Sequence, residues 1–239
     1  KYFTTTVRGR QDLKNITLPF LGEIPNCFPK RTGFARLKKK TDVENKKVVV
    51  KAGSRNVINE AFRSLRTNLD FMMKDNSSNA IALTSYNPGS GKSFISINLA
   101  IALAIQNKKV LVIDGDLRHA SVSQFAGAPK LGVSDFLAGR ISDVNDVVVR
   151  DKTYASLHVL PVGTIPPNPA ELLAQDLFKT MIENFKKEYD YVIVDCPPIE
   201  IVTDTHIIER SVDRTIFVIR AGLLERSMLG DLQNLYVNG

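Results

Sequence analysis

The chain has 239 residues, of which 44% are hydrophobic and 24% charged, a composition typical of one large soluble domain with an extension. It contains no run of about 20 consecutive apolar residues and no apolar leader core, so neither a membrane span nor a signal peptide is expected in it. Its two cysteines, Cys27 and Cys196, and its three histidines lack metal-ligand spacing, which indicates a reducing compartment and no structural zinc.

Positive charge is concentrated at the start of the chain. Residues 1–66 carry 16 Lys and Arg against 5 Asp and Glu, whereas residues 67–239 carry 16 against 20. The run Lys38-Lys39-Lys40 has none of the interleaved aromatic residues of a single-strand nucleic-acid binder. An anionic membrane surface is therefore a better partner than nucleic acid, with a merely solvated loop as the alternative.

The first fifty residues are predicted to be an N-terminal extension of the globular domain. Prolines punctuate residues 18–25, which we expect to form a strand-like anchor, and a mobile basic loop follows through Lys47. Residues 51–239 are then the globular domain.

Apolar periodicity next predicts alternating helices and strands. A helix over 56–73 precedes a strand at 80–84, a glycine-rich loop, a helix over 92–106 and a strand at 110–113, which together make a βαβ unit. Continuously apolar strands of this kind are buried on both faces of a parallel sheet. The expected fold is α/β, a P-loop NTPase-type, mostly parallel sheet with helices on both faces. Further strands are predicted at 157–161, 191–194 and 215–219, and further helices at 169–187 and 224–237.

The loop between the first strand and its helix has the composition of a phosphate-binding loop: Pro88, Gly89, Ser90, Gly91, Lys92 and Ser93. Glycines let consecutive backbone N–H groups turn toward phosphate oxygens, and the following helix N-terminus favours an anion. Lys92 would place its charge on the β and γ phosphates of ATP, and the Ser93 hydroxyl would bind Mg²⁺. Tyr86 stands where the usual pattern has its first glycine. The order of strand, loop and helix still favours a phosphate site over a chance turn.

Acidic residues close two of the predicted strands. Since ligands gather beyond the carboxyl ends of parallel strands, Asp114, Asp116 and Asp195 are aimed at the phosphate loop. Asp195 fits a Mg²⁺-holding role. Asp114 and Asp116, two apart on an extended chain, would project to one side, and one of them could take the proton of a phosphoryl acceptor. We assign the base to Asp114 and the metal to Asp116, an order that their spacing does not decide. Solvated strand-end acids are the alternative.

A charged stripe is predicted on the helix over 56–73. Glu60, Arg63 and Arg66 fall at i, i+3 and i+6, within about 120° of one helix face. Such a stripe forms either a docking surface or an internally ion-paired face toward solvent.

Four segments together resemble the bacterial tyrosine kinases (BY-kinases) of capsule and exopolysaccharide export. They are Glu60–Arg66, similar to an ExxRxxR oligomerisation motif, the proline-containing phosphate loop, the acidic strand ends at 113–118 and 194–198, and the stretch 166–173. The resemblance implies transfer of the ATP γ-phosphate to tyrosines, in trans within a ring whose subunits dock through Glu60, Arg63 and Arg66. It also implies that Asp114 activates the tyrosine hydroxyl, and that Asp116 and Asp195 serve the metal beside Ser93.

The same resemblance implies a cellular setting. The expected partners are copies of the chain itself, a transmembrane chain-length-control region, a cognate tyrosine phosphatase and the anionic inner-membrane surface. The expected location is the cytoplasmic face of the bacterial inner membrane. Residues 18–25 resemble the family's stretch just inside the membrane, which implies that residues 1–50 are a juxtamembrane-like extension. A tyrosine-rich tail is typical of the family, whereas only Tyr236 lies near the end of this chain, so we expect a C-terminally truncated kinase domain.

Two other functions fit part of the pattern. Switch ATPases of septum positioning and plasmid partition share the fold and loop, but they carry a signature lysine where this chain has Asn87, which favours the kinase. A nucleotide-binding scaffold without catalysis is the third hypothesis.

Overall fold

The computed structural model describes residues 5–26, 48–73, 78–199 and 204–237. Six strands form one sheet in the order β3-β4-β2-β5-β1-β6, parallel throughout except that β3 runs antiparallel to β4. The mostly parallel α/β class expected from the sequence is confirmed. The strands are β1 (Ala80–Thr84), β2 (Val110–Asp114), β3 (Val149–Arg150), β4 (Leu157–Leu160), β5 (Tyr191–Asp195) and β6 (Arg214–Phe217).

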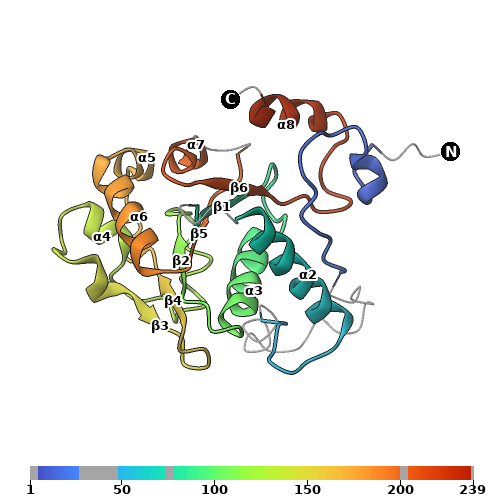
Figure 1. Cartoon of the computed structure of the whole chain (residues 1–239). Coiled ribbons are helices and arrows are strands. Elements are labelled where there is room, and N and C mark those ends of the chain that lie inside the picture. Colours follow the sequence, from blue (N-terminus) through green and yellow to red (C-terminus); the bar gives the residue numbers. More distant parts are fainter. Residues whose placement is uncertain (1–4, 27–47, 74–77, 200–203, 238–239) are drawn as a thin grey trace, which may run out of the picture.

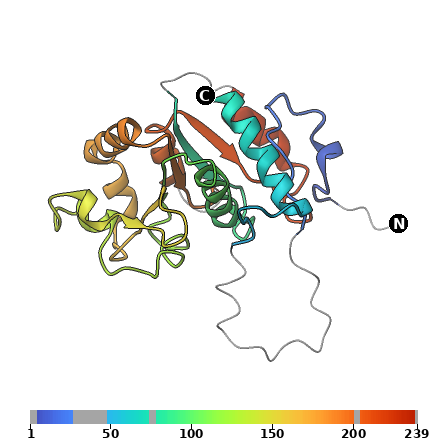
Figure 2. The ribbon, with the colours of Figure 1, turned by 60° about the horizontal axis from the view of Figure 1, so that its bottom comes forward.

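Helices cover both faces of this sheet, as expected (Figure 1). Helices α2 (Val57–Met72) and α3 (Lys92–Ala104) pack on one face. Helices α4 (Val133–Leu137), α5 (Pro169–Leu173), α6 (Asp176–Glu188) and α7 (Asp204–Glu209) pack on the other. Figure 2 shows these two groups on opposite sides of the strands. The remaining elements are η1 (Arg10–Leu13), η2 (Val144–Val147) and α8 (Met228–Val237).

Burial explains the sequence pattern of the central elements. Every residue of β1, β2, β4 and β5 is buried, because helices cover both faces. Helix α3 is apolar on all sides since it lies between α2 and the sheet. Helix α2 is amphipathic instead: Asn56 caps its start by accepting from the Asn59 N–H at 2.9 Å, and Phe62, Leu65 and Leu69 face the core.

Three predicted helices differ from the structure by two residues or more. The helix expected over 169–187 is two helices, because Gln175 adopts extended backbone and lets the apolar faces of α5 and α6 turn inward separately. The helix expected over 224–237 begins at Met228, since residues 222–226 bond to residues 5–7 instead. Helix α3 ends at Ala104, two residues short of the predicted end. The two-residue β3 and the short helices α4 and α7 were not predicted.

The strand-like anchor predicted at residues 18–25 is wrong, because no strand forms there. The segment runs along α2 instead: the Asn68 side chain donates to the Leu21 carbonyl at 2.8 Å, and Leu21 and Ile24 pack on the core. The predicted basic loop lies mostly outside the described residues. The division into an extension of residues 1–50 and a domain of residues 51–239 stays a prediction. No helix in the described part of the chain is long and apolar enough to cross a bilayer.

Candidate functional site

The predicted phosphate loop joins β1 to α3 at the carboxyl edge of the sheet. Gly89 and Gly91 have φ of 74° and 97°, the left-handed region that glycine adopts without strain, and Gly91 is the N-cap of α3. The Ser90 hydroxyl donates to the Asn87 carbonyl at 2.8 Å, which closes the loop. A Cβ at either glycine would meet nothing within 4 Å, so open space lies beside both glycines. This geometry fits anion binding at a helix N-terminus.

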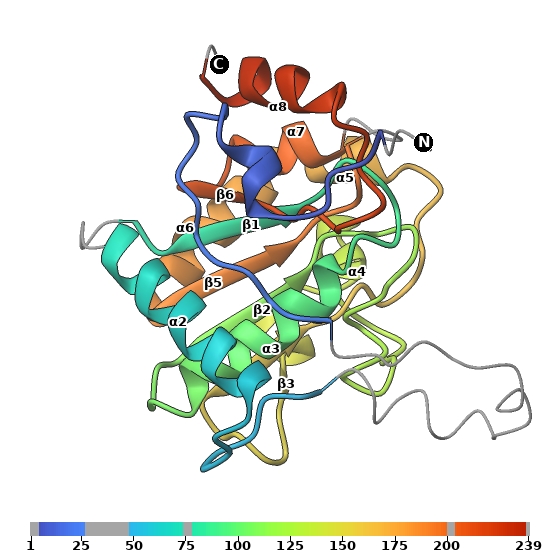
Figure 3. The ribbon, with the colours of Figure 1, turned by 90° about the vertical axis from the view of Figure 1, so that its right-hand side faces the viewer.

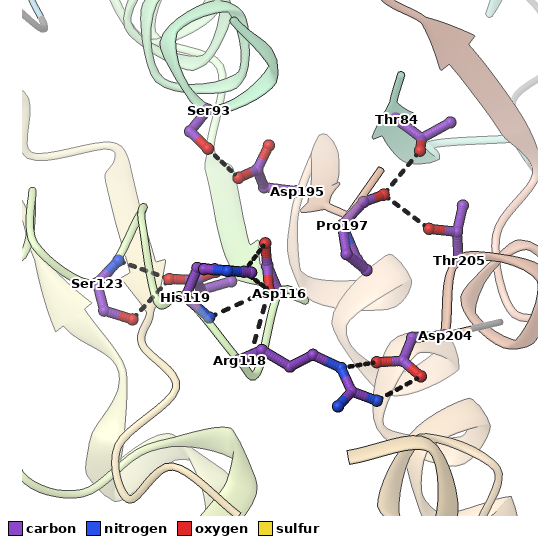
Figure 4. Close-up of polar contacts among 11 residues, drawn as sticks. Thr84, Ser93, Asp116, Arg118, His119, Ser123, Asp195, Pro197, Asp204 and Thr205 are labelled. Carbon is purple, nitrogen blue, oxygen red and sulfur yellow. Dashed lines mark hydrogen bonds and ion pairs between the residues drawn. The ribbon is translucent and has the colours of Figure 1, made fainter. Parts of the chain in front are cut away.

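Asp195 lies at the centre of the site, because β5 is placed between β1 and β2. Its carboxylate accepts from Ser93 Oγ at 2.5 Å (Figure 4). It also accepts from Ser96 Oγ at 2.9 Å. Burial raises the pKa of Asp195 to about 6, although these two hydroxyls and the Lys92 charge act in the opposite direction. Asp195 and Ser93, which we expected to serve the same metal, are therefore brought into contact, and their metal role stays a prediction.

Asp114 is the Cα partner of Asp195 on the neighbouring strand and is fully buried. Its Oδ2 accepts from both the backbone N–H and the Oγ of Ser123, each at 2.7 Å. Its Oδ1 has no hydrogen-bond partner among the described residues. Burial, with the nearby charge of Asp195 second, raises the pKa of Asp114 to about 7. A carboxylate with one fixed oxygen and one unpartnered oxygen is suited to accept a proton or to approach a cation.

Asp116 follows a bend at Gly115. The Gly115 N–H donates to the Asp195 carbonyl at 2.9 Å, and a Cβ at Gly115 would lie 2.9 Å from the Val194 side chain, so only glycine allows this approach. Asp116 accepts from the N–H groups of Arg118 and His119 at 3.3 and 3.2 Å. Its charge contributes to raising the pKa values of Asp114 and Asp195, so the three predicted acids do converge.

The residues present fit Mg²⁺ bound together with phosphate. Among the described residues, no three His, Cys, Asp or Glu side chains form a complete metal site. Mg²⁺ in nucleotide sites needs no such cage, because it takes one or two carboxylates and fills its shell with phosphate oxygens and water. The unpartnered Asp114 Oδ1 and the mutual repulsion of the three acids favour a cation here.

Several residues of the site escaped prediction. Ser96 lies one helical turn after Ser93, a spacing that could have indicated it, whereas Ser123 lies in a loop that carries no motif. Arg118 had no expected role. It binds the buried carboxylate of Asp204 through Nε at 3.1 Å and Nη2 at 3.4 Å, and so ties the acidic strand end at 113–118 to α7 (Figure 4).

The charged stripe on α2 is only partly as expected. Glu60 and Arg63 form an exposed ion pair at 2.6 Å, and Arg63 also donates to the Ser54 carbonyl at 2.9 Å. Arg66 turns toward α3 instead, where it donates to the Ala102 carbonyl at 2.9 Å. Glu60 and Arg63 therefore remain on the outer face, and an oligomerisation role stays a prediction.

The family model described as an AAA domain matches residues 78–230. The tyrosine-protein kinase CpsD of Streptococcus agalactiae is 39% identical over 171 residues, which are 70% of this chain and 72% of that protein. The BceF tyrosine kinase domain superposes with a TM-score of 0.80 at 30% identity, covering 98% of this chain and 95% of that one. The chain belongs to the bacterial tyrosine kinase family.

Other BY-kinases are similar over a smaller share of their length. The putative tyrosine-protein kinase EpsB of Ralstonia nicotianae is 39% identical over 175 residues, and this BY-kinase chain spans only 23% of EpsB. A more distant structural similarity is to the septum site-determining protein MinD of Pyrococcus horikoshii, which was solved with Mg-ADP. Its TM-score is 0.51 at 26% identity, over 59% of this chain. The similarity to BY-kinases is therefore both more extensive and closer than that to the switch ATPase.

Proposed function

We propose that this chain is an ATP-dependent protein tyrosine kinase domain, which transfers the γ-phosphoryl group of Mg-ATP to tyrosine hydroxyls. The observation that carries the proposal is the convergence of Asp114, Asp116 and Asp195 on a phosphate loop, with Asp114 Oδ1 unpartnered. Relatives named tyrosine-protein kinases support the same function.

Each residue has a part in that reaction. The loop N–H groups and Lys92 would hold the phosphates, while Ser93, Asp195 and Asp116 would hold Mg²⁺, which would neutralise developing charge on the phosphoryl oxygens. Asp114 Oδ1 accepts the proton of the tyrosine hydroxyl while the tyrosine oxygen forms a bond to the γ-phosphorus. The bond from that phosphorus to the β–γ bridging oxygen breaks, and ADP leaves with the bond electrons. Ser123 keeps Asp114 oriented through its Oδ2.

We also propose that the kinase works within a ring of its own copies at the cytoplasmic face of the bacterial inner membrane. There it would regulate capsular or exopolysaccharide polymerisation with a transmembrane chain-length-control partner, and a cognate phosphatase would reverse the modification. The exposed pair Glu60 and Arg63, 52% and 41% accessible, supports a docking role for α2. The basic charge of residues 1–66 supports contact with an anionic surface.

The product distinguishes this function from the two alternatives. The purified chain is incubated with Mg-ATP and a tyrosine-containing copolymer, and phosphotyrosine and free phosphate are both measured. We expect phosphotyrosine, its loss in Lys92→Met, and its retention in the matched control Lys179→Met, on the exposed face of α6. Free phosphate without phosphotyrosine would instead support a switch ATPase, and neither product would support a scaffold.

A further inference from the structure

Arg220, outside the predicted motifs, touches the phosphate loop. It follows β6, whose neighbour β1 leads into that loop, so the ends of both strands lie at one edge of the sheet. Its Nη1 donates to the Gly89 carbonyl at 2.8 Å. The side chain is exposed, and its guanidinium makes no other hydrogen bond within the described residues.

This contact orients a peptide group of the loop. In a planar trans peptide the carbonyl and the following N–H point in opposite directions. By holding the Gly89 carbonyl toward itself, Arg220 therefore directs the Ser90 N–H away, and that N–H donates to no described residue. The remaining guanidinium donors of Arg220 add positive charge beside the loop, which attracts a polyphosphate.

An N-terminal segment bonds to residues 218–227, which join β6 to α8 and which we call the Arg220 loop. We call residues 5–12 the strap. Thr6 forms an antiparallel β-bridge with Glu225, and the Val7 N–H donates to the Leu224 carbonyl at 2.8 Å. The Val7 side chain is buried, with only 2% of its surface exposed. Figure 3 shows the strap (blue) beside the segment that joins β6 to α8. The strap lies outside the residues that the family model matches.

Further contacts join the strap to both sides of the site. Asp12 pairs with Arg226 at 2.8 Å, six residues beyond Arg220. Tyr86, in the segment that enters the phosphate loop, packs against the apolar cluster formed by Val7, Leu224 and Leu232. The strap, the Arg220 loop and the phosphate loop are thus one continuous packed unit.

We propose that Arg220 is a positioning residue of the nucleotide site, and that the strap holds it there, so that docking of the strap sets nucleotide affinity. The inference rests on the proposed function in that it requires a nucleotide in the phosphate loop. It adds a residue and a control element that the phosphate-loop chemistry does not include.

The first test is the affinity of the whole chain for a fluorescent ADP analogue in Mg²⁺. Arg220→Ala should weaken binding roughly five- to tenfold, the effect of losing a hydrogen bond from a charged group. Arg220→Lys should recover part of the loss, while the unfolding midpoint without nucleotide stays unchanged. The matched control is Arg214→Ala, an exposed arginine at the opposite end of β6, which should bind within about twofold of wild type. In kinase assays Arg220→Ala should raise the KM for ATP and leave kcat unchanged.

The second test asks whether the strap acts through Arg220. Val7→Ser loosens the strap, and in a folded chain it should weaken nucleotide binding as Arg220→Ala does. The double variant should then be no weaker than the weaker single variant. If Val7→Ser unfolds the chain, Asp12→Ala, which breaks the ion pair with Arg226, takes its place in the same double-variant comparison.

The outcomes separate the two proposals. Unchanged affinity in Arg220→Ala overturns the positioning role, and additive losses in the double variant overturn the strap mechanism. Both results leave the kinase function standing. A wild-type chain that binds no nucleotide overturns the proposed function and this inference together.

Discussion

Replacing Asp114 with asparagine should stabilise the nucleotide-free and metal-free protein, and more so at high pH. In the folded chain the pKa of Asp114 is about 7, against 3.8 for the ordinary carboxyl group. Because the folded pKa is raised, the folded state binds the extra proton, and the associated stability is lost as pH rises from about 4 through 7. At pH 8 the wild-type protein therefore keeps a buried charge that Asp114→Asn lacks.

The size of the effect follows from linkage. With pKa values of 3.8 and about 7, ionisation of Asp114 disfavours the folded state by about 2 kcal/mol at pH 5 and about 4 kcal/mol at pH 8. Asp114→Asn should thus gain ~2–3 kcal/mol more at pH 8 than at pH 5, an upper figure since local relaxation softens burial. For a chain of this size the gain corresponds to roughly 5–10 °C in the unfolding midpoint. Altered hydrogen bonding to Ser123 cancels from the difference, because it is common to both pH values.

Thermal unfolding in EDTA at pH 5 and pH 8, followed by circular dichroism, measures this difference directly. Asp231→Asn, at an exposed position of α8, is the control and should shift the midpoint equally at both pH values. A gain in stability for Asp114→Asn that is the same at both pH values, or smaller at pH 8, would refute the raised pKa of Asp114. The same variant should form no phosphotyrosine, because it cannot accept the hydroxyl proton.

Three further predictions concern packing and assembly. Gly115→Ala should lower the free energy of unfolding by about 2 kcal/mol in a denaturant titration, because its Cβ would lie 2.9 Å from the Val194 side chain. The control Gly230→Ala, whose Cβ would meet nothing within 4 Å, should not destabilise the protein in the same titration. Arg118→Ala should cost about 1–3 kcal/mol because it leaves Asp204, 1% exposed, without its cation. Adding Asp204→Asn should restore most of that loss, and a double variant less stable than Arg118→Ala would contradict the pairing. The double variant Glu60→Ala/Arg63→Ala should reduce the sedimentation coefficient of the assembled protein without changing its circular dichroism spectrum. These two residues test assembly better than Arg66, because Arg66 bonds to the Ala102 carbonyl of α3 within the same chain.

Local chemistry explains why the phosphate loop and its acids could be found in the sequence. A loop that needs positive φ at Gly89 and Gly91 demands glycine wherever it occurs, and buried parallel strands demand apolar runs. Once the strands were assigned, the meeting of Asp114, Asp116 and Asp195 followed, because parallel strands end at a common edge. The end of α3, the start of α8 and the split between α5 and α6 depend on finer packing and were missed or displaced.

Only the tertiary structure decided which side chains support these acids and the loop. Sequence spacing does not show which partner a side chain takes. In the structure Ser123 donates to Asp114, Arg118 binds Asp204, and Arg66 donates to the Ala102 carbonyl. Arg220 and Gly89 lie 131 positions apart, and the strap meets the Arg220 loop from the other end of the chain. Such contacts depend on how distant segments pack, so the sequence alone determined the ligand chemistry and the fold determined how that chemistry is held in place.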